Sequence, residues 1–263
     1  MNSILIPALV LGALAAVFGI LLVAASKVFR VEKDPREAEI RACLAGVNCG
    51  ACGYAGCDGY AAAVAKGEAD INCCGPGGSE TAEKIAKIMG LENAEIEGQK
   101  AFVACSGICG RVRVRFLYNG PQDCAAAMLF GGNGDKQCTR ACIGLGSCVK
   151  ACKFEALSIV DGIAKVDGEK CVGCGACADA CPKRLIKMLP KSRQYAVACT
   201  TKERGMAVVK VCDAGCIGCM KCMHSCPEGA MIVEKNLARI DAAKCTNCGL
   251  CAEVCPRGII RKI

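Results

Sequence analysis

The chain has 263 residues, 27 of them Cys, with one His, no Trp and a formal net charge of +8. This length excludes the small secreted domains that disulfides hold together, and so many thiols indicate a reducing compartment. The sequence has neither a Gly-x-Gly-x-x-Gly motif after a strand nor a P-loop, which excludes the common nucleotide-binding modules.

The N-terminal segment predicts a transmembrane helix. Residues 4–25 are 22 residues without a charged side chain, and at 1.5 Å each they would cross a hydrocarbon core of ~30 Å. A cleaved signal peptide is the alternative, but such a peptide begins with basic residues, and residues 1–3 have none. The positive-inside rule then places residues 31–263 in the cytoplasm, anchored by residues 1–30. The positive charges behind this orientation are Lys27, Arg30, Lys33 and Arg36.

A first cysteine group follows, in residues 31–95. Residues 49–57 read C-G-A-C-G-Y-A-G-C, and Cys74 extends the pattern to C-x2-C-x4-C-x16-C. The interleaved glycines let the backbone approach an inorganic cluster and donate amide hydrogen bonds to its sulfurs. A charged linker, residues 92–100, follows this group. The pattern predicts a four-cysteine [4Fe-4S] domain with the ligands Cys49, Cys52, Cys57 and Cys74.

Residues 96–263 contain three runs with the spacing C-x2-C-x2-C-x3-C-P. In bacterial ferredoxins three thiolates of such a run hold one [4Fe-4S] cube, and the fourth reaches a neighbouring cube. Structural zinc takes its ligands from two separated pairs, so the spacing favours iron–sulfur clusters. The runs are Cys171, Cys174, Cys177 and Cys181; Cys216, Cys219, Cys222 and Cys226; and Cys245, Cys248, Cys251 and Cys255.

An internal repeat orders these runs. Its offset, which we call the repeat shift, is 216 − 142 = 74 in residue number, and it places Cys142, Cys148 and Cys152 on Cys216, Cys222 and Cys226. The run that begins at Cys171 falls on the run that begins at Cys245. Each copy also has a hairpin pattern between its two cysteine loops. Each copy therefore predicts a two-cluster, ferredoxin-like module.

The crossed pattern assigns ligands to four clusters. In the first copy Leu145 stands where the second copy has Cys219, so one cluster is short of a cysteine. Cys138 is the nearest substitute, and without it this site would have three ligands and hold a [3Fe-4S] cluster. The four ligand sets are Cys152, Cys171, Cys174 and Cys177; Cys138, Cys142, Cys148 and Cys181; Cys216, Cys219, Cys222 and Cys255; and Cys226, Cys245, Cys248 and Cys251.

Five cysteines of this region remain: Cys105, Cys109, Cys124, Cys199 and Cys212. The repeat pairs Cys138 with Cys212 and nearly pairs Cys124 with Cys199. We predict a sixth cluster held by Cys105, Cys124, Cys199 and Cys212, and free or structural thiols are the alternative. The chain is thus expected to hold five to six [4Fe-4S] clusters.

The sequence resembles the B subunit of the Rnf electron-transport complex (RnfB). The blocks N-C-G-A-C-G-Y-A-G-C and C-x-P-G-G, and the extension C-T-R-A-C-I-G-L-G-S-C-V-K-A-C, carry this resemblance from the anchor to Cys255. By the resemblance, Cys74 is a ligand and Cys73 is a spare thiol. It implies a complex that oxidises reduced ferredoxin and reduces NAD or, in some archaea, a membrane carrier. Flavin, NAD and ion chemistry would then belong to other membrane and flavin subunits.

Two basic runs mark candidate contact surfaces. Arg111, Arg113 and Arg115 alternate with apolar residues, as on a strand with one basic face. An acidic soluble ferredoxin fits such charge, because complementary charge speeds encounter and orients redox partners. Nucleic acid would need stacking aromatics that are missing here, whereas lipid headgroups or plain solvation stay open. The second run is Lys183, Arg184, Lys187, Lys191 and Arg193.

We therefore predict an α+β chain in which a transmembrane helix precedes a small four-cysteine module and tandem ferredoxin-like modules. Its function would be electron transfer from reduced ferredoxin toward membrane subunits, with no catalytic side chain beyond the cluster ligands. The alternatives are a polyferredoxin of a membrane hydrogenase or heterodisulfide reductase, and a zinc-binding or metal-storage protein.

Overall fold

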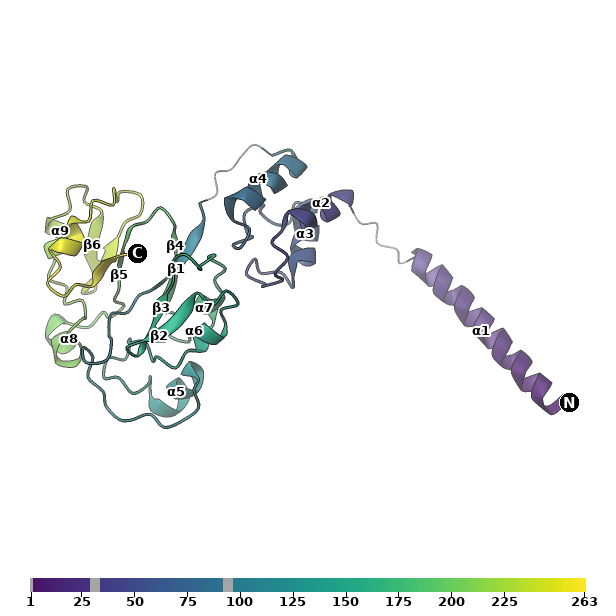
Figure 1. Cartoon of the computed structure of the whole chain (residues 1–263), viewed down its shortest axis with the longest axis horizontal. Coiled ribbons are helices and arrows are strands. Elements are labelled where there is room, and N and C mark those ends of the chain that lie inside the picture. Colours follow the sequence, from purple (N-terminus) through teal and green to yellow (C-terminus); the bar gives the residue numbers. More distant parts are fainter. Residues whose placement is uncertain (1, 29–33, 92–96) are drawn as a thin grey trace.

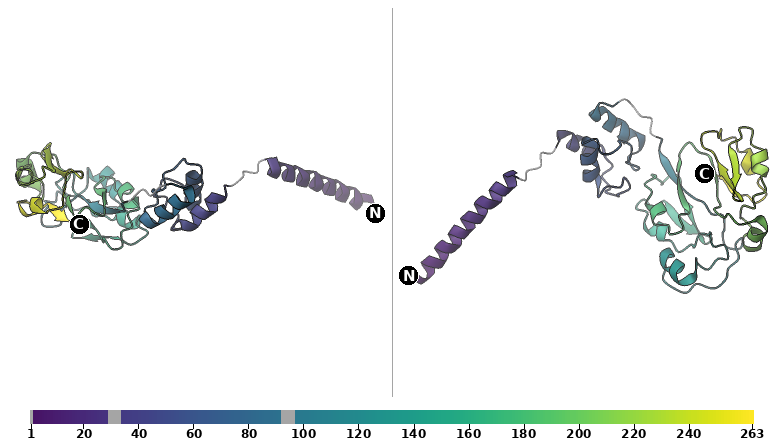
Figure 2. Two further views of the ribbon diagram at one scale, coloured as in Figure 1. Left: turned by 90° about the horizontal axis from the view of Figure 1, so that it is seen from above. Right: turned by 180° about the vertical axis from the view of Figure 1, so that it is seen from behind.

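The structure, a computed structural model, describes residues 2–28, 34–91 and 97–263. Helix α1 (Asn2–Val28) lies at one end of the molecule, away from the other elements (Figures 1 and 2). Side chains are described for residues 11–26 of this helix, and nearly all of them are exposed. The predicted anchor covers residues 4–25, and the side chains of its residues 4–10 lie outside the described part of the structure. Among the residues whose side chains the structure describes, no helix is both long and apolar enough to cross a membrane.

Three helices form a small N-terminal module: α2 (Pro35–Cys43), α3 (Cys57–Ala65) and α4 (Gly78–Met89). Asp34 caps α2, because its side chain accepts a hydrogen bond of 2.9 Å from the backbone N–H of Arg36. The loop between α2 and α3 and the loop between α3 and α4 contain most of the cysteines of the module. The centre of the module is formed by Ile40, Tyr60, Val64 and Ile85, none more than 1% exposed.

The rest of the described chain forms two modules of similar build, each with two antiparallel pairs of short strands. In the first module, β1 (Gln99–Val103) pairs with β4 (Ile186–Pro190), and β2 (Leu157–Val160) pairs with β3 (Ile163–Val166). In the second, β5 (Tyr195–Val197) pairs with β8 (Ile260–Lys262), and β6 (Met231–Glu234) pairs with β7 (Leu237–Ile240).

The elements between the first and last strands of the two modules are related by the repeat shift. Helices α6 (Ser147–Lys150) and α7 (Ala176–Asp179) fall on α9 (Lys221–His224) and α10 (Leu250–Glu253). The hairpin β2–β3 falls on β6–β7 in the same way, so both predicted hairpins are present.

The first strands of the two modules follow a different offset. Val103 pairs with Ile186 and Val197 pairs with Ile260. The first strands therefore differ by 197 − 103 = 94 in residue number, whereas their partners differ by 260 − 186 = 74. The first module thus has 94 − 74 = 20 extra residues between its first strand and its cysteine loops. This longer segment contains α5 (Cys124–Gly131), and the shorter one contains α8 (Gly205–Val211).

The predicted basic strand around Arg111 is not formed. Val112 and Val114 take part only in isolated bridges, to Cys109, Cys212 and Lys136. The arginines instead bind backbone carbonyls of the chain itself: Arg113 binds Val209, and Arg115 binds Gly132 and Gly134. This basic run therefore serves to hold the longer segment of the first module in place.

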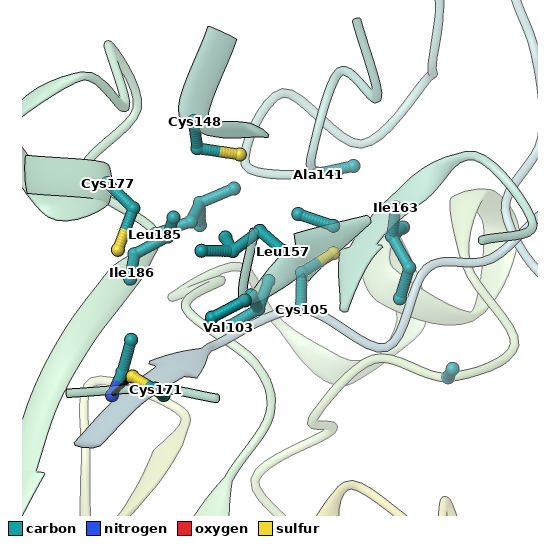
Figure 3. Close-up of a cluster of buried hydrophobic side chains, with 14 of the residues drawn as sticks. Val103, Cys105, Ala141, Cys148, Leu157, Ile163, Cys171, Cys177, Leu185 and Ile186 are labelled. Carbon is teal, nitrogen blue, oxygen red and sulfur yellow. Dashed lines mark hydrogen bonds between the residues drawn. The ribbon is translucent and has the colours of Figure 1, made fainter. Parts of the chain in front are cut away.

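Each module has a small core that mixes aliphatic side chains with cysteines. In the first module Leu157, Ile163 and Leu185 are buried around β1 and the cysteine loops (Figure 3). In the second, Met231, Leu237 and Ile259 occupy the positions related to these by the repeat shift. Cysteine side chains are among the buried members of both cores, beside the aliphatic side chains.

Candidate metal centres

Set 1 is the cysteine group of the N-terminal module: Cys49, Cys52, Cys57 and Cys74. The backbone N–H of Cys57 donates a hydrogen bond of 2.8 Å to the side chain of Asn48, which ties the start of α3 to the Cys49 loop. Burial raises the pKa of the Cys74 thiol, and the neighbouring thiols of Cys57 and Cys49 raise it further. Cys74 thus lies beside two other members of set 1. Burial raises the pKa of the adjacent Cys73 thiol, and the charges of Asp70 and of Cys52, the remaining member of set 1, raise it further.

Set 2 belongs to the first repeat module and consists of Cys152, Cys171, Cys174 and Cys177. Burial, followed by the charges of the other three thiols, raises the pKa of Cys177 to about 11. Four neighbouring thiols oppose one another's ionisation, whereas metal binding requires thiolates. Such a group is stable as four thiolates only when the thiolates share a cation. The neighbours of Cys177 are the other three members of the set that the spacing predicts, so the structure brings these four residues together.

Set 3 differs from the prediction in one member. A hollow in the first repeat module is lined by Cys124, Cys142, Cys148 and Cys181. Burial, followed by the charges of Cys142, Cys124 and Cys181, raises the pKa of Cys148 to about 12. The structure thus places Cys124 where we predicted Cys138.

The position of Cys124 is fixed by contacts between α5 and α6. The side chain of Asp123 accepts hydrogen bonds of 2.9 Å from the backbone N–H of Ala126 and from the Ser147 hydroxyl. The same hydroxyl accepts a hydrogen bond of 2.8 Å from the backbone N–H of Cys124. Ser147 directly precedes Cys148, so this contact brings Cys124 to the cysteine loop. In the sequence, Ser147 lies 23 positions after Cys124, and no spacing rule links the two residues.

Set 4 lies between the two repeat modules. Its hollow is lined by Cys105, Cys138, Cys199 and Cys212. Burial raises the pKa of Cys138, and the charge of Cys105 raises it further. Burial also raises the pKa of Cys212, and the charges of Cys138 and Cys105 raise it further. Compared with the predicted sixth group, this hollow has Cys138 in place of Cys124.

Set 4 follows the two offsets of the modules. Cys138 and Cys212 are related by the repeat shift, whereas Cys105 and Cys199 follow the larger offset of their strands. The Cys105 thiol accepts a hydrogen bond of 3.4 Å from the backbone N–H of Cys142. The Cys199 thiol accepts one of 3.3 Å from the N–H of Cys216, the residue equivalent to Cys142. The structural equivalent of Cys199 is thus Cys105 and not Cys124, because the extra residues of the first module change the register.

Buried donors without a partner surround set 4. Among the described residues, the buried side-chain nitrogen and oxygen atoms that lack a hydrogen bond are Ser106 Oγ, Thr200 Oγ1 and Arg257 Nε. Ser106 and Thr200 line the hollow and directly follow Cys105 and Cys199, and Arg257 binds the carbonyl of Cys212 at 2.7 Å. Unpaired buried polar groups cost about 1–3 kcal/mol each. The sulfide and thiolate acceptors of an iron–sulfur cluster would satisfy them, so these residues fit such a group.

Two lysines, the buried Lys136 and the half-buried Lys183, also fit a negatively charged group. Lys136 is only 4% exposed, and its ammonium donates to the carbonyls of Cys142 at 2.8 Å and Gly162 at 2.6 Å. The ammonium of Lys183 donates to the carbonyls of Asn133 and Ala141. Burial lowers the pKa of Lys183, whereas the thiols of Cys138 and Cys142 raise it. A buried cation is stable when an opposite charge lies nearby, which a thiolate-bound cluster would supply.

Sets 5 and 6 form the second repeat module as the crossed pattern predicts. Each set lines a hollow of its own. Burial and the charges of the other set members raise the pKa of Cys222, in set 5, to about 11. The same causes raise the pKa of Cys251 in set 6. Set 5 is Cys216, Cys219, Cys222 and Cys255, and set 6 is Cys226, Cys245, Cys248 and Cys251.

Three cysteines lie outside these six sets: Cys43, Cys73 and Cys109. Cys109 is exposed, and its backbone N–H donates a hydrogen bond of 2.8 Å to the carbonyl of Asp161. In the part of the chain that the structure describes, no three Cys, His, Asp or Glu side chains converge closely enough to hold a single metal ion. The hollows lined by sets 3, 5 and 6 instead leave space between their thiols.

The six sets form an unbroken series. The charge of Cys49 in set 1 acts on Cys174 in set 2, and that of Cys177 in set 2 acts on Cys148 in set 3. Cys105 of set 4 contacts the backbone of Cys142 in set 3. The sulfur of Cys199 in set 4 likewise accepts a hydrogen bond from the backbone N–H of Cys216 in set 5. Sets 5 and 6 share the cysteine loops of α9 and α10.

Comparisons with known proteins agree with this arrangement. An Fe-S cluster family model matches residues 44–76, and a 4Fe-4S dicluster domain model matches residues 138–185, 170–230 and 215–259. The B subunit of the Na⁺-translocating ferredoxin:NAD⁺ oxidoreductase complex of Acetobacterium woodii is 41% identical over 93% of this chain and 73% of its own. The B subunit of the ion-translocating oxidoreductase complex of Methanosarcina acetivorans is 40% identical over 93% of each chain. The chain belongs to the RnfB family.

The B subunit of the proton-translocating ferredoxin:NAD⁺ oxidoreductase complex of Clostridium ljungdahlii is also similar, at 42% identity over 92% of this chain and 85% of its own. The family resemblance of the sequence is thereby confirmed. As a member of the RnfB family, the chain is an iron–sulfur electron-transfer subunit of a membrane-associated, ion-translocating oxidoreductase complex, holds several [4Fe-4S] clusters and works with the other Rnf subunits.

Proposed function

We propose that sets 1 to 6 each hold one [4Fe-4S] cluster and that the chain conducts electrons from reduced ferredoxin toward membrane-embedded subunits. The observation that carries this proposal is the continuity of the series, in which every set lies near the next. Two relatives are named as parts of ferredoxin:NAD⁺ oxidoreductase complexes, and the archaeal relative is named without an acceptor. We therefore keep NAD or a membrane carrier as the final acceptor.

In this proposal the residues of the chain bind and tune the clusters, and each cluster supplies a one-electron carrier. The cysteines bind the iron atoms, and the N–H groups of Cys142 and Cys216 donate to ligand sulfurs. Lys136 and Lys183 supply positive charge beside sets 3 and 4. Such charge and hydrogen bonding to sulfur set the potentials of clusters.

We further propose that residues 1–30 anchor the chain in the membrane, residues 31–95 form a separate one-cluster domain, and residues 96–263 form the multi-cluster body. Helix α1 has 27 residues, which is about 40 Å at 1.5 Å per residue. Leu11, Phe18 and Leu22 are at least 60% exposed, as side chains that face lipid would be. Because set 1 lies nearest to this helix in the sequence, we assign it as the outlet toward the membrane subunits.

The cluster count tests this assignment. Fully loaded, anaerobically purified protein should contain about 24 iron atoms per chain, four for each of six clusters. Replacement of Cys109, which belongs to no set, by Ala should leave that number unchanged. About 12 iron atoms or fewer in fully loaded protein would reject the series as a path for electrons.

The anchor is tested by topology. Cysteine labelling or protease protection in oriented vesicles should place residues 31–263 on the cytoplasmic side. Residues 31–263 on the opposite side would overturn the proposed orientation, and a full-length chain that washes off the membrane without detergent would overturn the anchor.

A further inference from the structure

A wide groove separates the two repeat modules on one side of the body. It has a cavity volume of about 990 Å³ between β4 of the first module and β5 and β7 of the second. Phe102 and Leu189 line its first wall, and Leu237 and Ile240 line the other. The groove is therefore apolar at its walls and is built from both modules.

Positive charge dominates this groove. Seven of its 21 lining residues are Lys or Arg and none is Asp or Glu. Within the described part of the chain, no ion pair involves these seven side chains. Uncompensated charge of one sign in a concave surface focuses the electric field and attracts an opposite charge. The exposed members are Arg140, Arg184, Lys187, Lys202 and Arg239.

The groove adjoins set 4. Cys199 lines both the groove and the hollow between the modules, and so do Ala104, Thr139, Arg140 and Thr200. Set 4 therefore comes closest to a molecule seated in the groove. Cys245 and Cys248 of set 6, at the far end of the series, do not line it.

We propose that an acidic electron-donor protein docks in this groove and delivers its electrons next to Cys199, in the middle of the series. The inference rests on the proposed function, because it takes a ferredoxin as the donor. One electron leaves the donor and one is gained at set 4, with no bond made or broken and no proton moved. Sets 3, 2 and 1 then lead toward α1, and sets 5 and 6 form a branch.

A protein fits the groove better than a nucleotide does. The lining residues come from two modules and combine cations with apolar walls, as protein interfaces do. The chain has no glycine-rich phosphate loop, and none of the lining residues is acidic, so none could bind the hydroxyls of a ribose as an acidic side chain does.

Charge reversal tests the docking site in the complete membrane complex. The double variant Lys187→Glu/Arg239→Glu changes two exposed cations, one in each wall. Its Kd for a soluble, acidic two-cluster ferredoxin should rise about tenfold or more at low salt, and the difference should shrink as salt screens the charges. The matched control Lys170→Glu/Lys244→Glu changes two exposed lysines outside the groove, which are related by the repeat shift, and should change the Kd less than about twofold.

A second readout does not depend on electron transfer. A carbodiimide couples ferredoxin carboxylates to lysines that touch them, and the coupled peptides should contain Lys187 or Lys202. Coupling confined to Lys170 and Lys244 would place the donor elsewhere and overturn the inference. If NADH alone protects Lys187 from chemical acetylation, the groove binds a nucleotide, and this result would overturn the inference as well.

The outcomes separate the two proposals. All variants should be reduced by dithionite at the wild-type rate. A wild-type complex that neither binds ferredoxin nor is reduced by it contradicts the proposed function. A wild-type complex that reacts with ferredoxin, with an unchanged Kd and rate in Lys187→Glu/Arg239→Glu, contradicts only the groove.

Discussion

At the scale of single residues, Cys124 and Cys138 show how a ligand set depends on contacts between distant segments. The spacing rules predicted the members of sets 1, 2, 5 and 6, since those ligands lie within short loops or follow the crossed pattern. The rules placed Cys138 in set 3 and Cys124 in set 4, the reverse of their places in the structure. The hydrogen bond between Ser147 and Asp123, which holds Cys124 at set 3, leaves no pattern in the sequence. The extra residues of the first module also hid the pairing of Cys105 with Cys199.

Pairs of cysteine variants test this exchange. In Cys124→Ala/Cys148→Ala both changes fall in set 3, so the chain should lose about four iron atoms. In Cys124→Ala/Cys199→Ala they fall in sets 3 and 4, so it should lose about eight, because independent sites add. Iron and sulfide assays measure both. A loss of about eight iron atoms in the first double variant and four in the second would restore the grouping that spacing alone predicts.

Lys136 offers a test of the electrostatics at the same scale. The variant Lys136→Met removes a buried cation that acts on Cys142 in set 3. A unit charge ~10 Å away contributes about 1.7 kcal/mol at an effective dielectric constant of ~20, or on the order of 70 mV for one electron. Reduction adds negative charge, so the potential of the set 3 cluster should fall by roughly this amount in a spectroscopic titration. The control Lys165→Met, on an exposed position of β3, should leave it unchanged, and an unchanged potential in Lys136→Met would remove the lysine from this role.

At the scale of elements, the repeat decided what the sequence could predict. The hairpins and cysteine loops recur at the repeat shift, so one copy supports the prediction of the other. The first strands β1 and β5 recur at a larger offset and have no cysteine spacing to mark them. Arg111, Arg113 and Arg115 alternate as a strand does, yet their guanidinium groups bind carbonyls of the segment itself and its neighbours, which fixes an irregular path.

The contact between α5 and α6 brings Cys124 into set 3, and the variant Ser147→Ala tests this contact. The substitution removes the hydroxyl that bonds Asp123 and the N–H of Cys124, which should cost about 1–2 kcal/mol of stability. The set 3 cluster should then be lost first in an anaerobic chelator challenge, as followed by iron release and visible absorbance. The control Ser158→Ala, on an exposed position of β2, should release iron as the wild type does. Equal release from Ser147→Ala would show that other contacts hold Cys124 in place.

At the scale of the whole molecule, the contact between the N-terminal module and the first repeat module determines whether the series is continuous. A Cβ added to Gly75 would lie 3.1 Å from the carbonyl oxygen of Gly173 and 3.2 Å from Cα of Cys174. The ammonium of Lys153 also donates to the carbonyl of Asn48 at 3.4 Å. The sequence predicts each module from its own cysteines, but the approach of two glycine-containing loops from different modules has no local signal.

The variant Cys52→Ala tests the role of this contact. It removes one ligand of set 1, and the other sets should stay loaded, because metal binding is coupled to folding within the module that holds the metal. Reduced ferredoxin should still reduce the chain, but delivery to the final acceptor should be lost, since set 1 lies between set 2 and α1. The matched control is Cys73→Ala, which changes a thiol of the same module that belongs to no set and should retain both iron content and delivery. Wild-type turnover in Cys52→Ala, with the set 1 cluster shown to be missing, would take the N-terminal module out of the electron path and leave it a structural role.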